Sequence, residues 1–172
     1  MRQGADPHAL GPVLADLLGV PVELSEQGRQ AIALRELPNL AGPPEEPSVA
    51  VYLSDENGRG AQVLLLFPLP DARALGDLML GEGAGPEEIL DACREIGNVI
   101  AGRFLSDLAD AESGRLTPTP PLSTVDMAGA VISSVLASSP SGTGVVSLRI
   151  RMHAGDRRIC ATLILLRMEA GR

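Results

Sequence analysis

The stretch Val49-Ala-Val-Tyr-Leu-Ser-Asp-Glu-Asn-Gly-Arg-Gly-Ala-Gln-Val-Leu-Leu-Leu-Phe67 contains two runs of β-forming residues on either side of a turn sequence. The runs cover residues 49–53 and 61–67. The dipeptide Asn57-Gly58 between them strongly favours a tight hairpin turn. We therefore expect two antiparallel strands here, and this excludes a purely parallel sheet.

The same arrangement recurs near the C-terminus, where runs at 145–152 and 158–168 flank Ala154-Gly-Asp156. Helical patterns accompany the two hairpins at residues 69–80, 86–111 and 125–136. Gly81 supplies a stop for the first helix, and Pro86 suits the first turn of the second. Helix and hairpin units joined edge to edge predict an α+β fold, with long helices packed on a mostly antiparallel sheet in two layers.

An internal duplication is indicated, because a helix, a short extended segment and a hairpin appear twice. Gly11-Pro-Val-Leu-Ala-Asp-Leu17 can be aligned with Gly102-Arg-Phe-Leu-Ser-Asp-Leu108, which matches glycine, leucine, aspartate and leucine. Extended segments are then expected at 20–24 and 114–118. We predict a single domain over residues 1–172, made of a first repeat (1–85) and a second repeat (86–172).

Composition narrows the class of protein. The chain has 172 residues, of which 45% are apolar and 21% charged, as in a globular domain. A net charge of −8 and an aromatic content of 2% argue against a nucleic-acid surface. No apolar run has the length of a membrane span, and the chain does not open on a secretion signal, so we expect a cytoplasmic protein without membrane insertion.

The cysteines and histidines do not have metal-ligand spacing. Cys93 lies in an apolar helix face and Cys160 in an apolar strand, which favours two buried small side chains. His8 and His153 have no neighbouring ligands of the kind that a zinc site needs. We expect no metal site in this chain.

The predicted helix over residues 86–111 has a polar face that its packing does not require. At about 100° per residue, Asp91, Glu95, Asn98 and Gly102 fall within roughly 60° of one another. A solvated helix face often carries such residues. Gly102 is harder to explain, because an internal glycine costs a helix up to about 1 kcal/mol relative to alanine. The close approach of a partner's backbone would account for it.

The sequence resembles the CheC/CheX/FliY family of phosphatases. The family pattern is Asp or Ser, three residues, Glu, two residues, Asn, and then about twenty-two residues to a Pro. It appears here as Asp91, Glu95, Asn98 and then Pro120 or Pro121. Further similar blocks are Glu95-Ile-Gly-Asn-Val-Ile-Ala-Gly102, Asp126-Met-Ala-Gly-Ala-Val131, Val51-Tyr-Leu53 and Leu64-Leu-Leu-Phe67, and within the family CheC is the most similar.

This resemblance implies a phosphatase that acts on phosphorylated CheY or a similar response-regulator receiver in chemotaxis. It implies that Asn98 orients the attacking water and that Glu95 pairs with the receiver's active-site lysine, with Asp91 and Gly102 supporting the helix face. The chain would need no cofactor of its own, since the receiver supplies Mg²⁺. The resemblance also implies CheD as a further partner.

The first repeat departs from the family, in which both copies commonly carry the Glu/Asn pair. The proposed alignment sets Gly4 opposite Glu95 and Pro7 opposite Asn98, so we expect a degenerate first repeat and one active site. Two alternatives stay open. One is a non-catalytic binding domain comparable to the middle domain of the flagellar switch protein FliM, and the other is a CheD-binding domain that uses the third helix.

Overall fold

The computed structural model describes residues 7–41, 48–54, 61–112, 122–125, 128–139 and 143–167. In chain order its elements are η1 (Pro7–Leu10), α1 (Gly11–Leu18), β1 (Val22–Ile32), η2 (Leu34–Ala41), β2 (Ser48–Ser54), β3 (Ala61–Pro68), α2 (Leu69–Leu80), α3 (Pro86–Glu112), β4 (Leu122–Val125), α4 (Ala128–Ser138), β5 (Gly144–Ala154) and β6 (Arg157–Arg167). The elements η1 and η2 are 3₁₀ helices.

The strands in the described part of the chain form one six-stranded sheet in the order β1-β5-β6-β3-β2-β4. Every neighbouring pair in it is antiparallel. Both predicted hairpins are present as β2–β3 and β5–β6, and β3 pairs with β6 to join them at the centre of the sheet. The predicted α+β class is confirmed. The Asn57-Gly58 turn lies outside the described residues.

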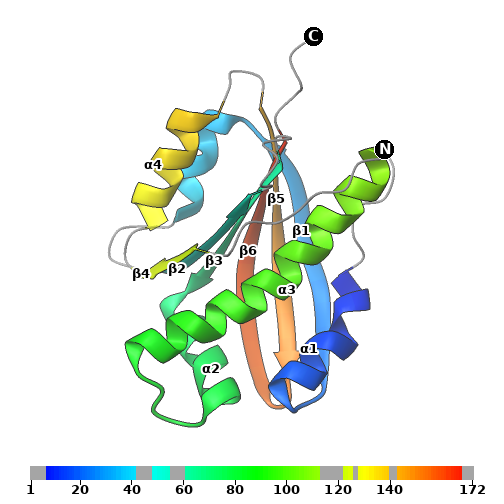
Figure 1. Cartoon of the computed structure of the whole chain (residues 1–172), viewed down its shortest axis with the longest axis vertical. Coiled ribbons are helices and arrows are strands. Elements are labelled where there is room, and N and C mark those ends of the chain that lie inside the picture. The colour runs from blue at the N-terminus through cyan, green and yellow to red at the C-terminus, as the bar shows by residue number, and fades with distance from the viewer. Residues whose placement is uncertain are drawn as a thin grey trace.

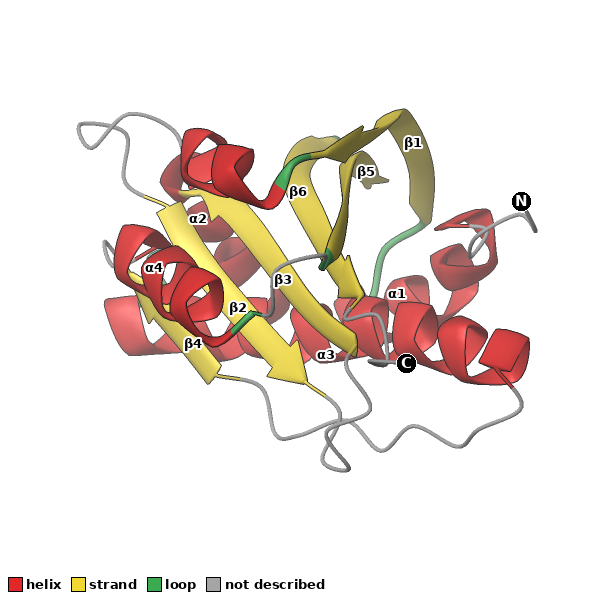
Figure 2. Ribbon diagram, turned by 90° about the horizontal axis from the view of Figure 1, so that it is seen from above, coloured by secondary structure: helices red, strands yellow, loops and turns green. Residues whose placement is uncertain are grey.

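Side chains of the central strands alternate between two apolar cores. Val49, Val51 and Leu53 of β2 face the larger core, which the helices α1, α2 and α3 cover. Ala50 and Tyr52 face a smaller core on the opposite side, beneath α4 and η2. Figure 1 shows α3 crossing the front of the sheet, and Figure 2 shows α4 on the other side of it. The second face therefore carries a partial third layer beyond the two layers expected from the sequence.

The 27-residue helix α3 approaches the sheet closely at one glycine. A Cβ atom at Gly97 would lie only 2.7 Å from Cγ1 of Val51, a side chain that is fully buried in β2. Real Cβ atoms essentially never approach another atom so closely. The absence of a side chain at Gly97 thus sets the distance between α3 and β2.

Two boundaries predicted from the sequence are wrong. The third helix was expected over residues 125–136, but Leu122–Val125 forms strand β4 and α4 begins at Ala128. The reason is tertiary, because β4 completes the edge of the sheet by pairing with β2. Strand β1 also extends far beyond the expected 20–24 segment, since it pairs with β5 as far as Ile32 and has an irregularity between Glu26 and Gly28.

The strand order has an internal symmetry. Exchanging β1, β2 and β3 with β4, β5 and β6 reproduces the same order read from the other end. This is what two similar units joined at β3 and β6 would give, while the division into repeats at residues 1–85 and 86–172 stays a prediction. The extended segment expected at 114–118 and the loop at 42–47 lie outside the described residues.

Candidate functional site

The N-terminus of α3 is fixed by its own first turn. Pro86 occupies the first helical position, where its missing N–H costs nothing. The side chain of Glu88 turns back and accepts a hydrogen bond from the backbone N–H of Gly85 at 2.7 Å. This is one half of a capping box, and the carboxylates of Glu87 and Glu88 also face the positive end of the helix dipole. The start of the candidate site helix is therefore well defined.

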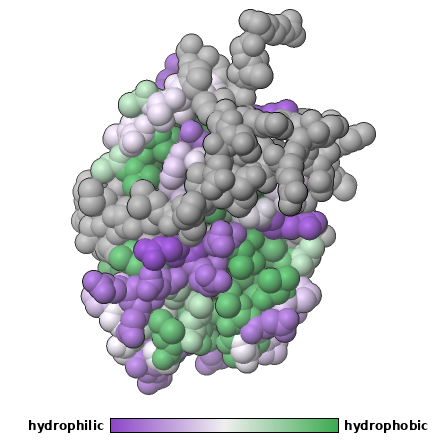
Figure 3. All heavy atoms as spheres, in the orientation of Figure 1, coloured by the Kyte–Doolittle hydropathy of each residue, from purple (hydrophilic) through white to green (hydrophobic). Residues whose placement is uncertain are grey.

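Opposite faces of α3 have opposite surroundings, as the sequence predicted. Cys93, Ile96 and Ile100 point into the larger core, with exposures of 2% or less. Asp91, Glu95 and Asn98 are exposed, and Gly102 is half-buried. A hydrophilic band follows the lower part of α3 on the molecular surface in Figure 3. The helix thus brings all four predicted site residues onto one accessible face.

Asp91 differs from the other polar residues of this face, because it already has a partner. Its Oδ1 accepts a hydrogen bond from Nη1 of Arg94 at 2.6 Å, which forms an ion pair within one turn of the helix. The side chain of Asp91 is 67% exposed, and such surface pairs contribute at most about 1 kcal/mol. Within the described part of the chain, Glu95 and Asn98 make no hydrogen bond or ion pair, so their polar atoms can meet a partner.

Gly102 lies in open space. Outside its own turn of the helix, no heavy atom lies within 4 Å of the position that a Cβ would take at Gly102. This contrasts with Gly97 on the buried side. Packing within the described residues therefore gives no reason for a glycine at this position of the helix. A side chain added at Gly102 would therefore begin without a clash, although the residue itself is half-buried.

The two cysteines have different environments. Cys93 is fully buried, and burial raises the pKa of its thiol to about 12, so it behaves as a small apolar core residue. Cys160 is half-buried, which corrects the expectation of two fully buried side chains. Its backbone N–H donates to Oδ1 of Asp71 at 3.1 Å. Among the described residues, no group of three or more His, Cys, Asp and Glu side chains is placed to hold a metal ion.

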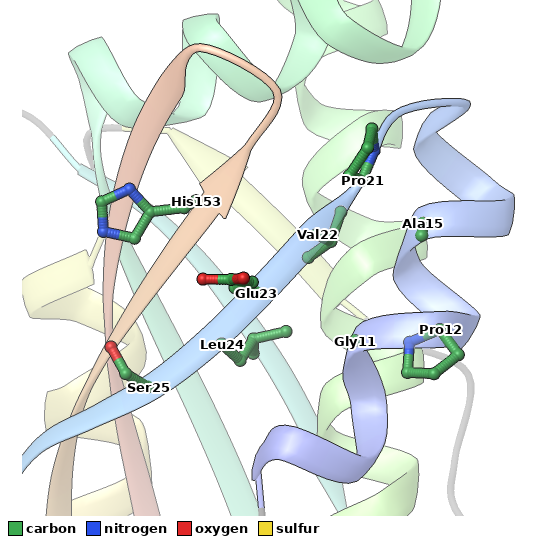
Figure 4. Close-up of a pocket in the computed structure, with 9 residues that line it drawn as sticks. All are labelled: Gly11, Pro12, Ala15, Pro21, Val22, Glu23, Leu24, Ser25 and His153. Atoms are coloured by element: carbon green, nitrogen blue, oxygen red, sulfur yellow. The ribbon is translucent and has the colours of Figure 1, made fainter.

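A pocket of about 540 Å³ lies elsewhere, between α1 and the first half of β1 (Figure 4). It is lined by Gly11, Pro12, Ala15, Pro21, Val22, Glu23, Leu24, Ser25 and His153. Glu23 and His153 are its ionisable residues, and they are direct partners on the neighbouring strands β1 and β5. None of the predicted site residues lines this pocket, and Asp91, Glu95 and Asn98 lie on the exposed face of α3 instead.

No helix in the described ranges combines the length and the apolar character needed to cross a membrane.

Comparison with known proteins finds similarity in sequence to a chemotaxis protein. The chain matches no family model. It is 27% identical over 130 residues to the CheY-P phosphatase CheC of Bacillus subtilis (strain 168), and the match covers 72% of this chain and 62% of CheC. The chain thus spans less than two thirds of the length of this relative.

Several solved structures share the fold. FliY of Thermotoga maritima superposes with a TM-score of 0.72 at 14% identity, covering 91% of this chain and 82% of FliY. The middle domain of FliM from H. pylori gives a TM-score of 0.60 at 13% identity over 92% and 83% of the two chains. A complex of CheX with CheY, BeF3 and Mg²⁺ from Borrelia burgdorferi gives 0.55 at 19% identity over 92% and 93%.

The resemblance to the CheC/CheX/FliY family, first noted from the motif around Glu95 and Asn98, is confirmed by these comparisons. The structural matches lie below 25% identity, so they establish the fold. They include FliM as well as the CheX and FliY proteins.

Proposed function

We propose that this chain is a phosphatase of a phosphorylated CheY-like receiver in chemotaxis signalling. The observation that supports it most is the placement of Glu95 and Asn98, which lie one turn apart, exposed, and without partners among the described residues on the outer face of α3. The similarity to CheC of Bacillus subtilis, which is named as a CheY-P phosphatase, points the same way.

Asn98 is the residue that we assign to the chemistry. An aspartyl phosphate is a reactive acyl phosphate, so a catalyst need only hold a water in line with the phosphorus. A carboxamide can both donate a hydrogen bond to that water and accept one from it. It also brings no negative charge to the phosphoryl group, whereas a carboxylate at the same place would repel it. The receiver contributes its own Mg²⁺, which neutralises the developing charge.

Glu95 and Asp91 act through position. On this proposal the Glu95 carboxylate pairs with a lysine of the receiver and sets the angle at which α3 docks. Asp91 is held by Arg94 at 2.6 Å and supports the same face one turn before Glu95. The bare backbone at Gly102 lets the receiver come close one turn beyond Asn98. On this proposal the chain acts in the cytoplasm, where a chemotaxis receiver resides.

The alternative is a binding domain without catalysis. Its support is the fold shared with the middle domain of FliM at a TM-score of 0.60. A binding role through CheD would use α4 instead, where Ile132 and Val135 are buried and leave less of the helix for a partner. Neither of these binding roles explains why Glu95 and Asn98 lie exposed and without partners among the described residues.

Phosphate release separates the two functions. A CheY receiver is phosphorylated with acetyl phosphate in the presence of Mg²⁺, freed of excess reagent, and mixed with a substoichiometric amount of this protein. We expect phosphate release well above that of the receiver alone, with many turnovers per chain. Binding of the phosphorylated receiver with no acceleration would establish the adaptor instead.

A further inference from the structure

The sheet face opposite α3 is covered over only part of its length. Near one end of β5 and β6, Val145, Ile164 and Leu166 are buried in the smaller core with α4 and η2. Toward the other end, the residues of this same face are polar and at least partly accessible. They are Arg149, Arg151 and His153 of β5 and Arg158, Cys160 and Thr162 of β6. In Figure 2 the ribbon of α4 lies over β2 and β4, away from β5 and β1.

This uncovered face is basic within an acidic protein. The chain carries a net charge of −8 and has no lysine. Three of its arginines, Arg149, Arg151 and Arg158, nevertheless lie on this face, whereas the register turns Arg157 and Arg167 of the same hairpin toward the other side of the sheet. Clusters of like charge weaken a fold unless a partner neutralises them. Positive charge gathered at this place therefore needs an explanation.

Arg149 and Arg151 both have unmet hydrogen-bonding capacity. In the part of the chain that the structure describes, neither makes a hydrogen bond or an ion pair. The Nε of Arg151 is moreover buried without a partner there, which is costly for a charged group. Arg158, farther along the face, interacts electrostatically with the carboxylate of Asp71, whose pKa it lowers, and His153 is the register partner of Glu23 on β1.

A polar pocket of about 480 Å³ adjoins Arg149. Side chains with hydrogen-bonding groups line it from three strands and from η2, among them Gln30, Asn39, Ser147 and Thr162. Ser147 is only 4% exposed. No carboxylate lines the pocket, and its other arginine, Arg29, is already bonded through two nitrogens to Glu26. The pocket therefore offers one uncommitted guanidinium and several neutral donors, which is the chemistry that binds a carboxylate.

We propose that this face, named here the Arg149–Arg151 face, binds an extended acidic segment of a partner protein. Arg149 and Arg151 are two residues apart on one strand, so their side chains emerge about 6.6 Å apart on the same side of the sheet. An extended peptide presents its alternate side chains at the same spacing. Carboxylates at positions i and i+2 would meet the two arginines together, with the first one at the mouth of the pocket.

The acidic peptide is favoured over other polyanions by the rest of the molecule. The net charge of −8 repels a long nucleic acid or an anionic membrane at distance, whereas a short segment meets only the local arginines. The Arg149–Arg151 face and α3 lie on opposite sides of the sheet. A partner bound there leaves the outer face of α3 free.

The test uses a fluorescently labelled peptide with glutamates at alternate positions, and fluorescence anisotropy with the full chain. We expect saturable binding that weakens with salt and that exceeds binding of an isomeric peptide whose glutamates are consecutive. Arg149→Glu and Arg151→Gln should each weaken it by about tenfold or more. Arg149 is exposed, so its substitution tests the surface without disturbing the core.

Arg157→Glu is the matched control, because Arg157 is an exposed arginine of the same hairpin whose register turns it toward the opposite side of the sheet. It should change the affinity by less than about twofold. The Glu95→Lys variant should bind the peptide as the unchanged protein does, which separates this proposal from the phosphatase. Equal losses in Arg157→Glu and Arg149→Glu would overturn it. So would an absence of peptide binding, or tighter binding of single-stranded RNA or of phosphatidylglycerol vesicles through the same arginines.

Discussion

Two glycines of α3 have opposite surroundings, and their substitution by alanine should have opposite effects on stability. A Cβ at Gly97 would overlap Cγ1 of Val51 at 2.7 Å, whereas a Cβ at Gly102 would meet nothing within 4 Å. Alanine is favoured over glycine inside a helix by up to about 1 kcal/mol in either place. At Gly97 this gain is outweighed by overpacking, which typically costs about 1–3 kcal/mol.

We predict that Gly97→Ala lowers the free energy of unfolding by about 1–2 kcal/mol, and that Gly102→Ala raises it by about 0.5–1 kcal/mol. Urea denaturation followed by circular dichroism measures both. The double variant Gly97→Ala/Val51→Ala should lose less stability than the sum of the losses of the two single variants. The reason is that removal of the valine methyls makes room for the new Cβ. Strict additivity would show that Val51 is not the obstacle.

Substitution of Gly102 also tests the receiver's approach to the helix. If the open backbone at Gly102 admits the receiver, a large side chain such as leucine at this position should reduce receiver affinity while the fold is retained. Titration of the variants with the receiver measures this. Unchanged affinity for Gly102→Leu would leave this glycine outside the docking surface.

At Glu95 the expected effect is on binding. Glu95→Ala should weaken the complex with a phosphorylated receiver, and Glu95→Lys should weaken it further through like-charge repulsion with the receiver lysine. Isothermal titration at two salt concentrations measures both, and the difference between them should shrink as salt screens the charges. Equal affinities for all three proteins would make Glu95 a solvated helix residue.

Among the elements, those with local signals could be predicted and those defined by distant pairing could not. The helix at 69–80 was predicted with its observed bounds, because Gly81 ends it with a positive φ of 97° and donates its N–H to Asp77. Strand β4 was missed, since its four residues become a strand only by pairing with β2. The polar face of α3 was predicted from helical periodicity, but the Asp91–Arg94 ion pair depends on rotamers that periodicity does not specify.

A single side chain joins α2 to β6. Oδ1 of Asp71, in the first turn of α2, accepts the backbone N–H of Cys160 at 3.1 Å, at a point on β6 beyond its pairing with β3. Asp71→Ala should lower the free energy of unfolding by about 1–3 kcal/mol, because it leaves a partly buried N–H without its acceptor. Asp71→Asn retains an acceptor oxygen and should stay close to the unchanged protein at neutral pH. Urea unfolding of the two variants is the measurement.

The same residue gives a pH dependence with a defined sign. Burial raises the pKa of the Asp71 carboxyl, against the opposing effects of the Cys160 N–H and of Arg158. The folded state therefore holds a proton on this group more readily than the unfolded state does, so its contribution to stability increases as the pH falls through the window above the ordinary aspartate pKa. The unchanged protein should gain stability relative to Asp71→Asn over that window. A loss of stability relative to Asp71→Asn as the pH falls would contradict a raised pKa at Asp71.

In the molecule as a whole, the two halves contribute equally to the sheet and unequally to the proposed chemistry. Helix α1 begins only at Gly11 and has eight residues, and Pro7 lies before it in η1. The described part of the first half therefore presents no long helix with a polar face comparable to that of α3. If the duplication is correct, it has kept the packing residues Leu14, which is buried, and Leu17, which packs against the larger core. At the aligned positions it has Gly4 and Pro7 in place of the Glu/Asn pair.

We predict one receiver per chain at saturation. Calorimetric titration with a receiver activated by BeF3 and Mg²⁺ should give a stoichiometry near one, and Glu95→Lys should remove most of the binding. Two receivers per chain, with one site retained in Glu95→Lys, would show that the first half also binds.

The central claim is that Asn98 positions the attacking water, and the most direct test is phosphate release from a phosphorylated receiver by the Asn98→Ala variant. We expect the rate to fall by about 10²–10³, as it does when one positioning group is removed from an active site. Because Asn98 is exposed, the unfolding free energy and the receiver affinity should stay close to those of the unchanged protein. An Asn98→Ala protein that still releases phosphate at close to the original rate would contradict the account.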